Sequence, residues 1–137
     1  MPQAGLTLLE LLLTLLLLAI VLVVAAPQWP NSLLLAAQAE QLAQDLRYTQ
    51  ALAMQRQQTH TIQWSTLQRY TIRDATNQPI TAQPPELAYG VTAEPFTCSF
   101  AATTGQPNAA SRIPLHLGNE TRTLQVNALT GLVTLQP

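Results

Sequence analysis

A single carboxylate, Glu10, stands inside a stretch that is otherwise almost wholly apolar, AGLTLLELLLTLLLLAIVLVVAAP at residues 4–27. A lone charge deep in a bilayer costs about 2.5–3.5 kcal/mol or more, so such a residue usually has an oppositely charged partner. No Lys or Arg lies within reach along the same helix. The chemistry open to Glu10 is therefore ion pairing with a cation supplied from elsewhere.

The other reactive groups are few and scattered. His60 and His116 are the only histidines, and neither has an acid or a cysteine at ligand spacing, so we expect surface or half-buried side chains, no metal and no cofactor. Cys98 is alone, is expected to be buried, and has no adjacent basic residue to activate it. The sequence contains no nucleotide-binding or hydrolase motif, which argues against an enzyme.

The apolar run from Leu6 to Ala26 contains no Gly or Pro and would form a helix of roughly 31 Å, close to the hydrocarbon thickness of a bilayer. A domain this small could not surround such a rod as a core helix. A cleaved secretory signal fits poorly, because MPQAG has no basic residue and Pro27 follows the best small-residue site. The segment is predicted to cross a membrane.

The stretch from Gly5 to Pro27 resembles the type IV prepilin signature, which has a glycine, an apolar residue, Thr, two apolar residues, Glu and then a long apolar helix. In that family a prepilin peptidase cuts after the glycine and methylates the new N-terminus. The resemblance implies cleavage between Gly5 and Leu6, N-methylation of Leu6 and a role for Glu10 in assembly. It also aligns Pro27 with a helix-bending proline that many pilins have.

The α-amine freed at Leu6 is a cation that could partner Glu10, since it stays charged near neutral pH. At about 4 Å and an effective dielectric near 20, the attraction is about 4 kcal/mol before desolvation is subtracted. In a filament the amine could belong to a neighbouring subunit, and the pair would then set the axial register of packed helices. The alternative is that Glu10 sits at the membrane edge and reaches for water.

The rest of the sequence predicts an α+β, pilin-like fold, in which a long N-terminal helix, transmembrane and then amphipathic, packs on a C-terminal antiparallel β-sheet. Pro27 and Pro30 should kink or break the helix, and Asn31 or Ser32 could cap its restart. Residues 33–57 then carry an apolar stripe at spacings of three and four. The stripe consists of Leu35, Ala39, Leu42, Leu46, Thr49 and Ala53, with Gln38 and Asp45 lying mostly off it.

After Gln58 the apolar residues recur at every second position, which predicts strands. Residues 60–64 and 69–73 form a predicted hairpin, 82–95 an irregular connection and 96–100 a short strand. A three-stranded meander closes the chain at residues 112–117, 121–127 and 132–136. Its core candidates are Ile113, Leu115, Leu117, Leu124, Val126, Val133 and Leu135.

The predicted organisation is a prepilin leader at residues 1–5, a transmembrane and filament-core helix at 6–26, a kinked amphipathic helix at 27–58 and a periplasmic sheet domain at 59–137. The segments at 42–64 and 122–135 resemble the helix end, first strand and last hairpin of the GspH/FimT group of minor pilins and pseudopilins. Similar C-terminal segments occur in minor pilins of the mannose-sensitive haemagglutinin type.

This resemblance implies a minor pseudopilin or minor pilin that assembles into, or initiates, a type II secretion pseudopilus or a type IV-like pilus. Its implied partners are other pilin or pseudopilin subunits, prepilin peptidase and an inner-membrane assembly platform. Its implied location is the bacterial inner membrane, crossed once, with the C-terminal domain in the periplasm.

Two other functions stay open at this point. One is a DNA-binding minor pilin for natural transformation, and the other is an unrelated membrane-anchored periplasmic domain. Nucleic acid is not the expected partner, because the chain after Ala26 has six Arg and six acids. Arg112 and Arg122 are the only cations near the C-terminus, and Glu120 adjoins them, which is too little to neutralise several phosphates.

Overall fold

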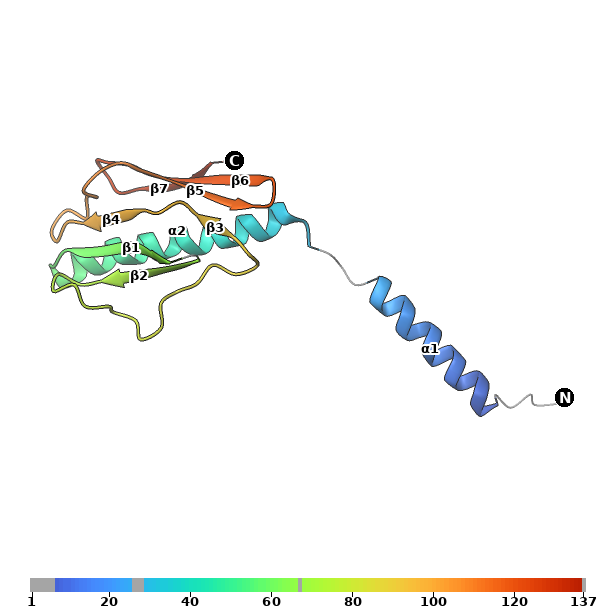
Figure 1. Ribbon diagram of the computed structural model, residues 1–137. Coiled ribbons are helices and arrows are strands. Elements are labelled where there is room, and N and C mark those ends of the chain that lie inside the picture. Colours follow the sequence, from blue (N-terminus) through green and yellow to red (C-terminus); the bar gives the residue numbers. More distant parts are fainter. Residues whose placement is uncertain (1–6, 26–28, 67, 137) are drawn as a thin grey trace.

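The computed structural model describes residues 7–25, 29–66 and 68–136. Its first helix, α1 (Leu8–Val24), contributes no buried residue, and every position from Thr7 to Ala25 is exposed. Figure 1 shows α1 standing away from the domain that follows it. Within the described residues, no helix combines the length and the hydropathy needed to cross a membrane. Leu6 and Ala26, the ends of the predicted apolar segment, lie outside these residues.

The second helix, α2 (Asn31–Arg56), buries the whole of the predicted stripe against the rest of the domain. Gln38 is predicted to lie mostly off this stripe, but it is buried together with it and is only 7% exposed. Its side-chain oxygen accepts a hydrogen bond from the N–H of Ala88 at 2.8 Å, which ties a distant loop to the helix. The helix ends at Gln57, whose left-handed backbone (φ 51°) directs its N–H to the carbonyl of Ala53.

The strands form two antiparallel sheets, where the sequence predicts one. The first has the order β2 (Arg69–Arg73), β1 (His60–Thr66), β4 (Thr97–Phe100), and β1 and β2 are the predicted hairpin. The second has the order β3 (Thr92–Ala93), β5 (Ser111–Leu117), β6 (Glu120–Val126), β7 (Val133–Gln136), and its last three strands are the predicted meander. β3 lies inside the connection predicted to be irregular, and it pairs with β5 along the sheet edge.

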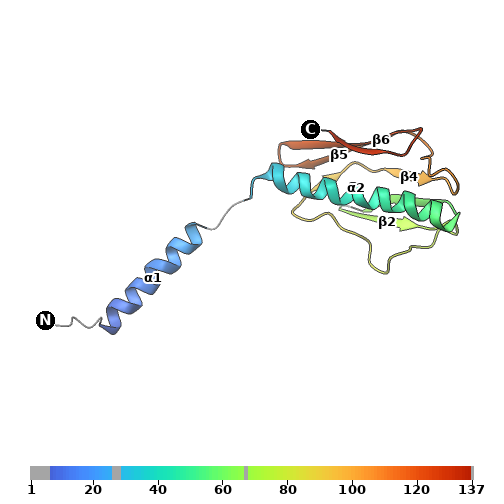
Figure 2. The same cartoon turned by 180° about the vertical axis from the view of Figure 1, so that it is seen from behind.

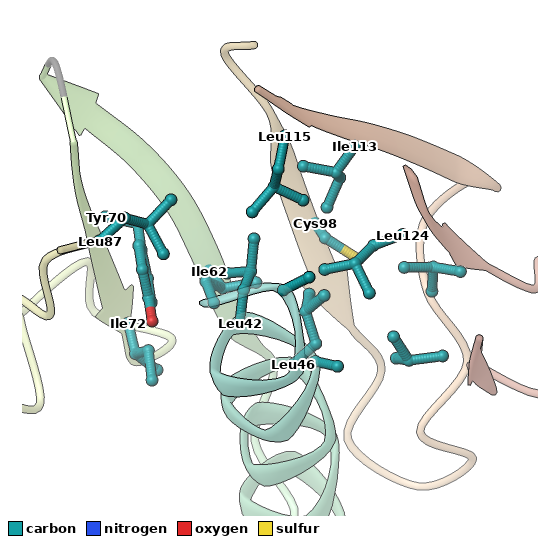
Figure 3. Packing of buried hydrophobic residues seen from close by; sticks show 14 of the residues in the cluster. Leu42, Leu46, Ile62, Tyr70, Ile72, Leu87, Cys98, Ile113, Leu115 and Leu124 are labelled. Atoms are coloured by element: carbon teal, nitrogen blue, oxygen red, sulfur yellow. The ribbon is translucent and has the colours of Figure 1, made fainter. Parts of the chain in front are cut away.

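The core lies where α2 crosses both sheets, since the helix contacts strands of each of them. Figure 3 shows Leu42 and Leu46 of α2 between side chains of the two sheets, with Ile62 on one side and Leu124 on the other. Full burial of a leucine contributes about 1.5–3 kcal/mol, so this helical stripe is a large part of what holds the two sheets together. The fully buried side chains of this core include Leu35, Leu42, Leu46, Ile62, Tyr70, Leu87, Phe100, Ile113, Leu115 and Leu124.

One polar pair joins α2 to β2. The hydroxyl of buried Tyr70 donates a hydrogen bond to the carboxylate of Asp45. Burial and, after it, this carboxylate raise the pKa of Tyr70 above its usual range. Asp45, which lies off the predicted stripe, is thus half-buried and part of the contact between helix and sheet.

Candidate assembly site

A threonine fixes the start of α1. Thr7 has an extended backbone (φ −72°, ψ 151°), and its hydroxyl oxygen accepts a hydrogen bond from the N–H of Glu10 at 3.3 Å. The N–H of Leu11 donates to the carbonyl of Thr7 at 3.1 Å. Glu10 is therefore the third residue of the helix, where the helix dipole favours a carboxylate.

Sequence reasoning missed Thr7, although a signal for it is present. Thr7 and Glu10 have the Thr-x-x-Glu spacing that marks a helix start when an apolar run follows. The same pair of residues thus satisfies one of the unpaired N–H groups of the first turn and places the carboxylate at that end of the helix.

Glu10 and Thr14 are the two polar side chains of α1. Thr14 is satisfied within the helix, because its hydroxyl donates to the carbonyl of Leu11 at 2.8 Å. Glu10 has no such partner: both ion pairs in the described part of the chain join other residues, Glu40 with Arg47 and Arg69 with Glu86. The site is an exposed carboxylate at the first turn of an exposed apolar helix, and it can bind a cation.

The predicted cleavage and methylation positions, Gly5 and Leu6, lie outside the described residues, and so does Pro27. Pro30 has an extended backbone (φ −62°, ψ 140°), and α2 begins at the next residue. No side chain caps this helix start, so the prediction that Asn31 or Ser32 would do so is wrong. Both residues already lie in the first turn of α2, and Pro30 is the residue that precedes the helix.

The groups considered for metal or thiol chemistry lie apart from this site. The prediction of a surface or half-buried side chain is wrong for His60, which is fully buried, with Nδ1 2.8 Å from the carbonyl oxygen of Gln58. His116 is half-buried, and its Nδ1 lies 3.0 Å from the Thr121 hydroxyl. Across the described ranges, no three or more His, Cys, Asp or Glu residues gather where they could hold a metal ion.

Cys98 is buried, as predicted, and unpaired within the described residues. Its burial raises the pKa of the thiol to about 11, so the reactive thiolate is disfavoured near neutral pH.

Arg112 and Arg122 point to opposite faces of the second sheet. Arg112 precedes buried Ile113 on β5, whereas Arg122 pairs across the ladder with buried Leu115. Because successive side chains of a strand alternate between faces, Arg122 lies on the α2 side and Arg112 on the outer side. These two cations do not form one patch.

Comparison with known proteins agrees with this geometry. Residues 1–26 match the family described as the prokaryotic N-terminal methylation motif. The chain has a fold similar to that of the type IV minor pilin FimU of Pseudomonas aeruginosa PAO1 in a P21 crystal form, with a TM-score of 0.62 and 18% identity, over 75% of this chain and 88% of that one. The comparison with the P65 crystal form of the same protein gives a TM-score of 0.60 and 19% identity, over 75% of this chain and 93% of that one. No curated protein sequence matches the chain.

The fold is therefore α+β and pilin-like, with α2 packed on two antiparallel sheets. Residues 1–26 carry an N-terminal methylation motif, and the chain has a pilin-like fold.

Proposed function

We propose that the chain is a minor pilin or minor pseudopilin. Prepilin peptidase cleaves it after Gly5 and methylates Leu6, and the mature chain assembles into, or initiates, a type IV-like pilus or a type II secretion pseudopilus. Before assembly it is held in the bacterial inner membrane by the segment at 6–26, with the domain in the periplasm. Its partners are other pilin or pseudopilin subunits, the peptidase and the inner-membrane assembly platform.

The observation that carries this proposal is the chemistry of α1. The helix exposes a leucine-rich surface on all sides and contributes nothing to the core of its own domain. An apolar helix with no core contact requires a bilayer or other helices around it. Its one charge stands in the first turn, so helices packed side by side can be aligned through it.

Glu10 is proposed to pair with the N-terminal amine of a neighbouring subunit. The carboxylate lies four residues after Leu6, so an amine of the same chain is about one helical turn away. An amine from a neighbour satisfies the same charge while it joins two subunits. Within apolar surroundings a carboxylate with no partner is costly, and this cost favours the register in which the pair forms.

The finer assignment is to the GspH/FimT group, on the strength of the sequence segments at 42–64 and 122–135. A role in DNA uptake is the less favoured alternative, because Arg112 and Arg122 lie on opposite faces of the sheet. Binding of a polyanion needs several cations on one surface.

Replacement of Glu10 by Gln tests the proposal, because it keeps the shape of the side chain and removes its charge. We expect membrane insertion to be retained and co-assembly with partner subunits to fall at least tenfold, the equivalent of about 1.4 kcal/mol. Thr14→Ala is the matched control, since it removes the other polar side chain of α1, whose hydrogen bond lies within the helix. Pull-down of partner subunits from the producing bacterium gives the measurement. Equal assembly of Glu10→Gln and Thr14→Ala would contradict the role of Glu10.

A further inference from the structure

Three exposed apolar or aromatic residues lie at the end of the domain that is nearest to α1. They are Trp29, Leu33 and Tyr89, which are 67%, 54% and 65% exposed. We call them the α1-proximal patch. Trp29 and Leu33 belong to this end through the chain itself, because they flank the start of α2. Tyr89 comes from a loop that is distant in sequence.

The position of Tyr89 is set by Gln38. Gln38 lies about two turns into α2, about 10 Å along the axis from Asn31, and its side-chain oxygen accepts a hydrogen bond from the N–H of Ala88. In Figures 1 and 2 the yellow loop between β2 and β3 reaches the end of the domain where α2 begins. Tyr89 therefore lies beside the first turns of α2, on the side of α1.

The loop presents Tyr89 on an unusual backbone. Tyr89 and Gly90 both have positive φ (59° and 76°), and the N–H of Val91 donates to the carbonyl of Ala88 at 3.1 Å. Positive φ at both central residues is the pattern of a type I′ turn, in which glycine or asparagine is the usual occupant. A large exposed side chain at such a position costs conformational energy, and residues of this kind gather at functional surfaces.

The patch itself carries no charge. Glu86, three residues before Tyr89, is paired with Arg69 at 3.0 Å. The tip of the β5–β6 hairpin also lies at this end, because a side chain at Gly118 would come within 3.5 Å of Asn31, and its charged residue is Glu120. Because the patch is uncharged and the charged residue of the adjoining hairpin tip is acidic, this end of the domain fits a neutral, amphipathic environment better than an anionic one.

We infer that, before assembly, the domain rests on the membrane surface through the α1-proximal patch, with Trp29 and Tyr89 at the level of the lipid headgroups. The inference rests on the proposed insertion of α1. Trp29 follows Val24 by five residues, so even a fully extended chain keeps it within about 18 Å of the helix end. Trp and Tyr are enriched at this depth because their rings are apolar and their N–H or O–H group reaches water. The bilayer is thus the surface that the patch meets first.

Single-tryptophan reporters in the full chain test the inference. The background is Trp29→Phe with Trp64→Phe, and Tyr89→Trp is added as the reporter. Leu129→Trp is the matched control: Leu129 is 75% exposed but belongs to a turn held by Gln50, about 28 Å along α2 from Asn31. Leu16→Trp reports separately on the insertion of α1. Each variant is reconstituted in phosphatidylcholine vesicles at low protein density, with bromine atoms near the headgroup end of the lipid chains or near their middle.

The inference predicts that the tryptophan of Tyr89→Trp is quenched by the shallow bromines and that of Leu129→Trp is not. Quenching of Leu16→Trp by the deep bromines together with no quenching of Tyr89→Trp would overturn the inference and leave the proposed function intact. No quenching of Leu16→Trp would contradict the insertion itself. A blue-shifted but unquenched signal from Tyr89→Trp would mean that another protein copy covers the patch, and this too would overturn the inference.

Discussion

At the scale of single residues, Cys98 is a reactive group that is buried in the core. Its side chain faces α2 from β4, in the same cluster as Leu124 and Ile113 (Figure 3). Burial disfavours the thiolate and raises the pKa to about 11. In the unfolded chain the Cys98 thiol has its ordinary pKa of 9.0, below that in the folded state. The folded state therefore gains stability from this residue only while the thiol is protonated. That contribution is complete at neutral pH and is lost as the pH rises toward 11.

The first prediction concerns this thiol. At pH 8 we expect iodoacetamide to leave Cys98 unmodified in the native protein and to modify it in urea. Between pH 8 and 11 the free energy of unfolding should fall by about 2 kcal/mol more in the parent than in Cys98→Ala, since only the parent carries the thiol. Urea unfolding at each pH measures the difference, and parallel pH curves for the two proteins would refute it.

The burial of a residue was predictable where it depends on the periodicity of the sequence. It was not predictable where it depends on contacts between distant segments of the chain. Leu35, Leu42 and Leu46 are buried as their spacing indicates. Gln38 and Asp45 are polar and lie beside that stripe, yet Gln38 is buried and Asp45 is half-buried. Gln38 accepts a hydrogen bond from the N–H of Ala88, and Asp45 accepts one from the hydroxyl of Tyr70. A single sequence does not contain the position of those partners.

At the scale of elements, one side chain of α2 holds two turns together. The Gln50 amide donates to the carbonyls of Gly105 and Thr130, both at 2.9 Å, and so joins the loop after β4 to the turn between β6 and β7. Gly131 must be glycine for two reasons. Its φ is +70°, and a Cβ there would lie 2.3 Å from the Gln50 nitrogen and 2.9 Å from the carbonyl oxygen of Gly105.

We predict that Gly131→Ala destabilises the domain by about 1–3 kcal/mol more than Gly90→Ala does. Gly90 is a matched control, because its φ of +76° brings the same backbone strain while nothing lies within 4 Å of its added Cβ. Urea unfolding followed by Trp64 fluorescence gives the comparison. Equal losses in the two variants would show that the contacts with Gln50 and Gly105 are unimportant.

The longer helices and strands were predictable from the sequence, but the arrangement of the strands in two sheets was not. α2, the β1–β2 hairpin and the last three strands appear where the hydrophobic periods change. β3 was missed because two residues between prolines show no period, and its pairing with β5 depends on the tertiary structure. The division into two sheets, both in contact with α2, is likewise a tertiary feature that no local pattern records.

At the scale of the whole molecule, the chain has two parts that differ in burial. The domain from α2 onward buries its own core, whereas α1 buries nothing. The sequence indicated the candidate site through one unusual residue, Glu10, and its spacing from Gly5. The helix cap at Thr7 was predictable from its Thr-x-x-Glu spacing to Glu10. The proposed role of Glu10 requires that Leu6 become the N-terminus, since only then does a free α-amine lie about one helical turn from the carboxylate.

Mass spectrometry of the N-terminal peptide from cells with an active prepilin peptidase therefore tests the central claim most directly. The account predicts a mature chain that begins at N-methylated Leu6, with residues 1–5 removed. A chain that retains Met1 in those cells would contradict it, because Glu10 would then have no amine within one turn of its own helix or at the same level of a neighbour.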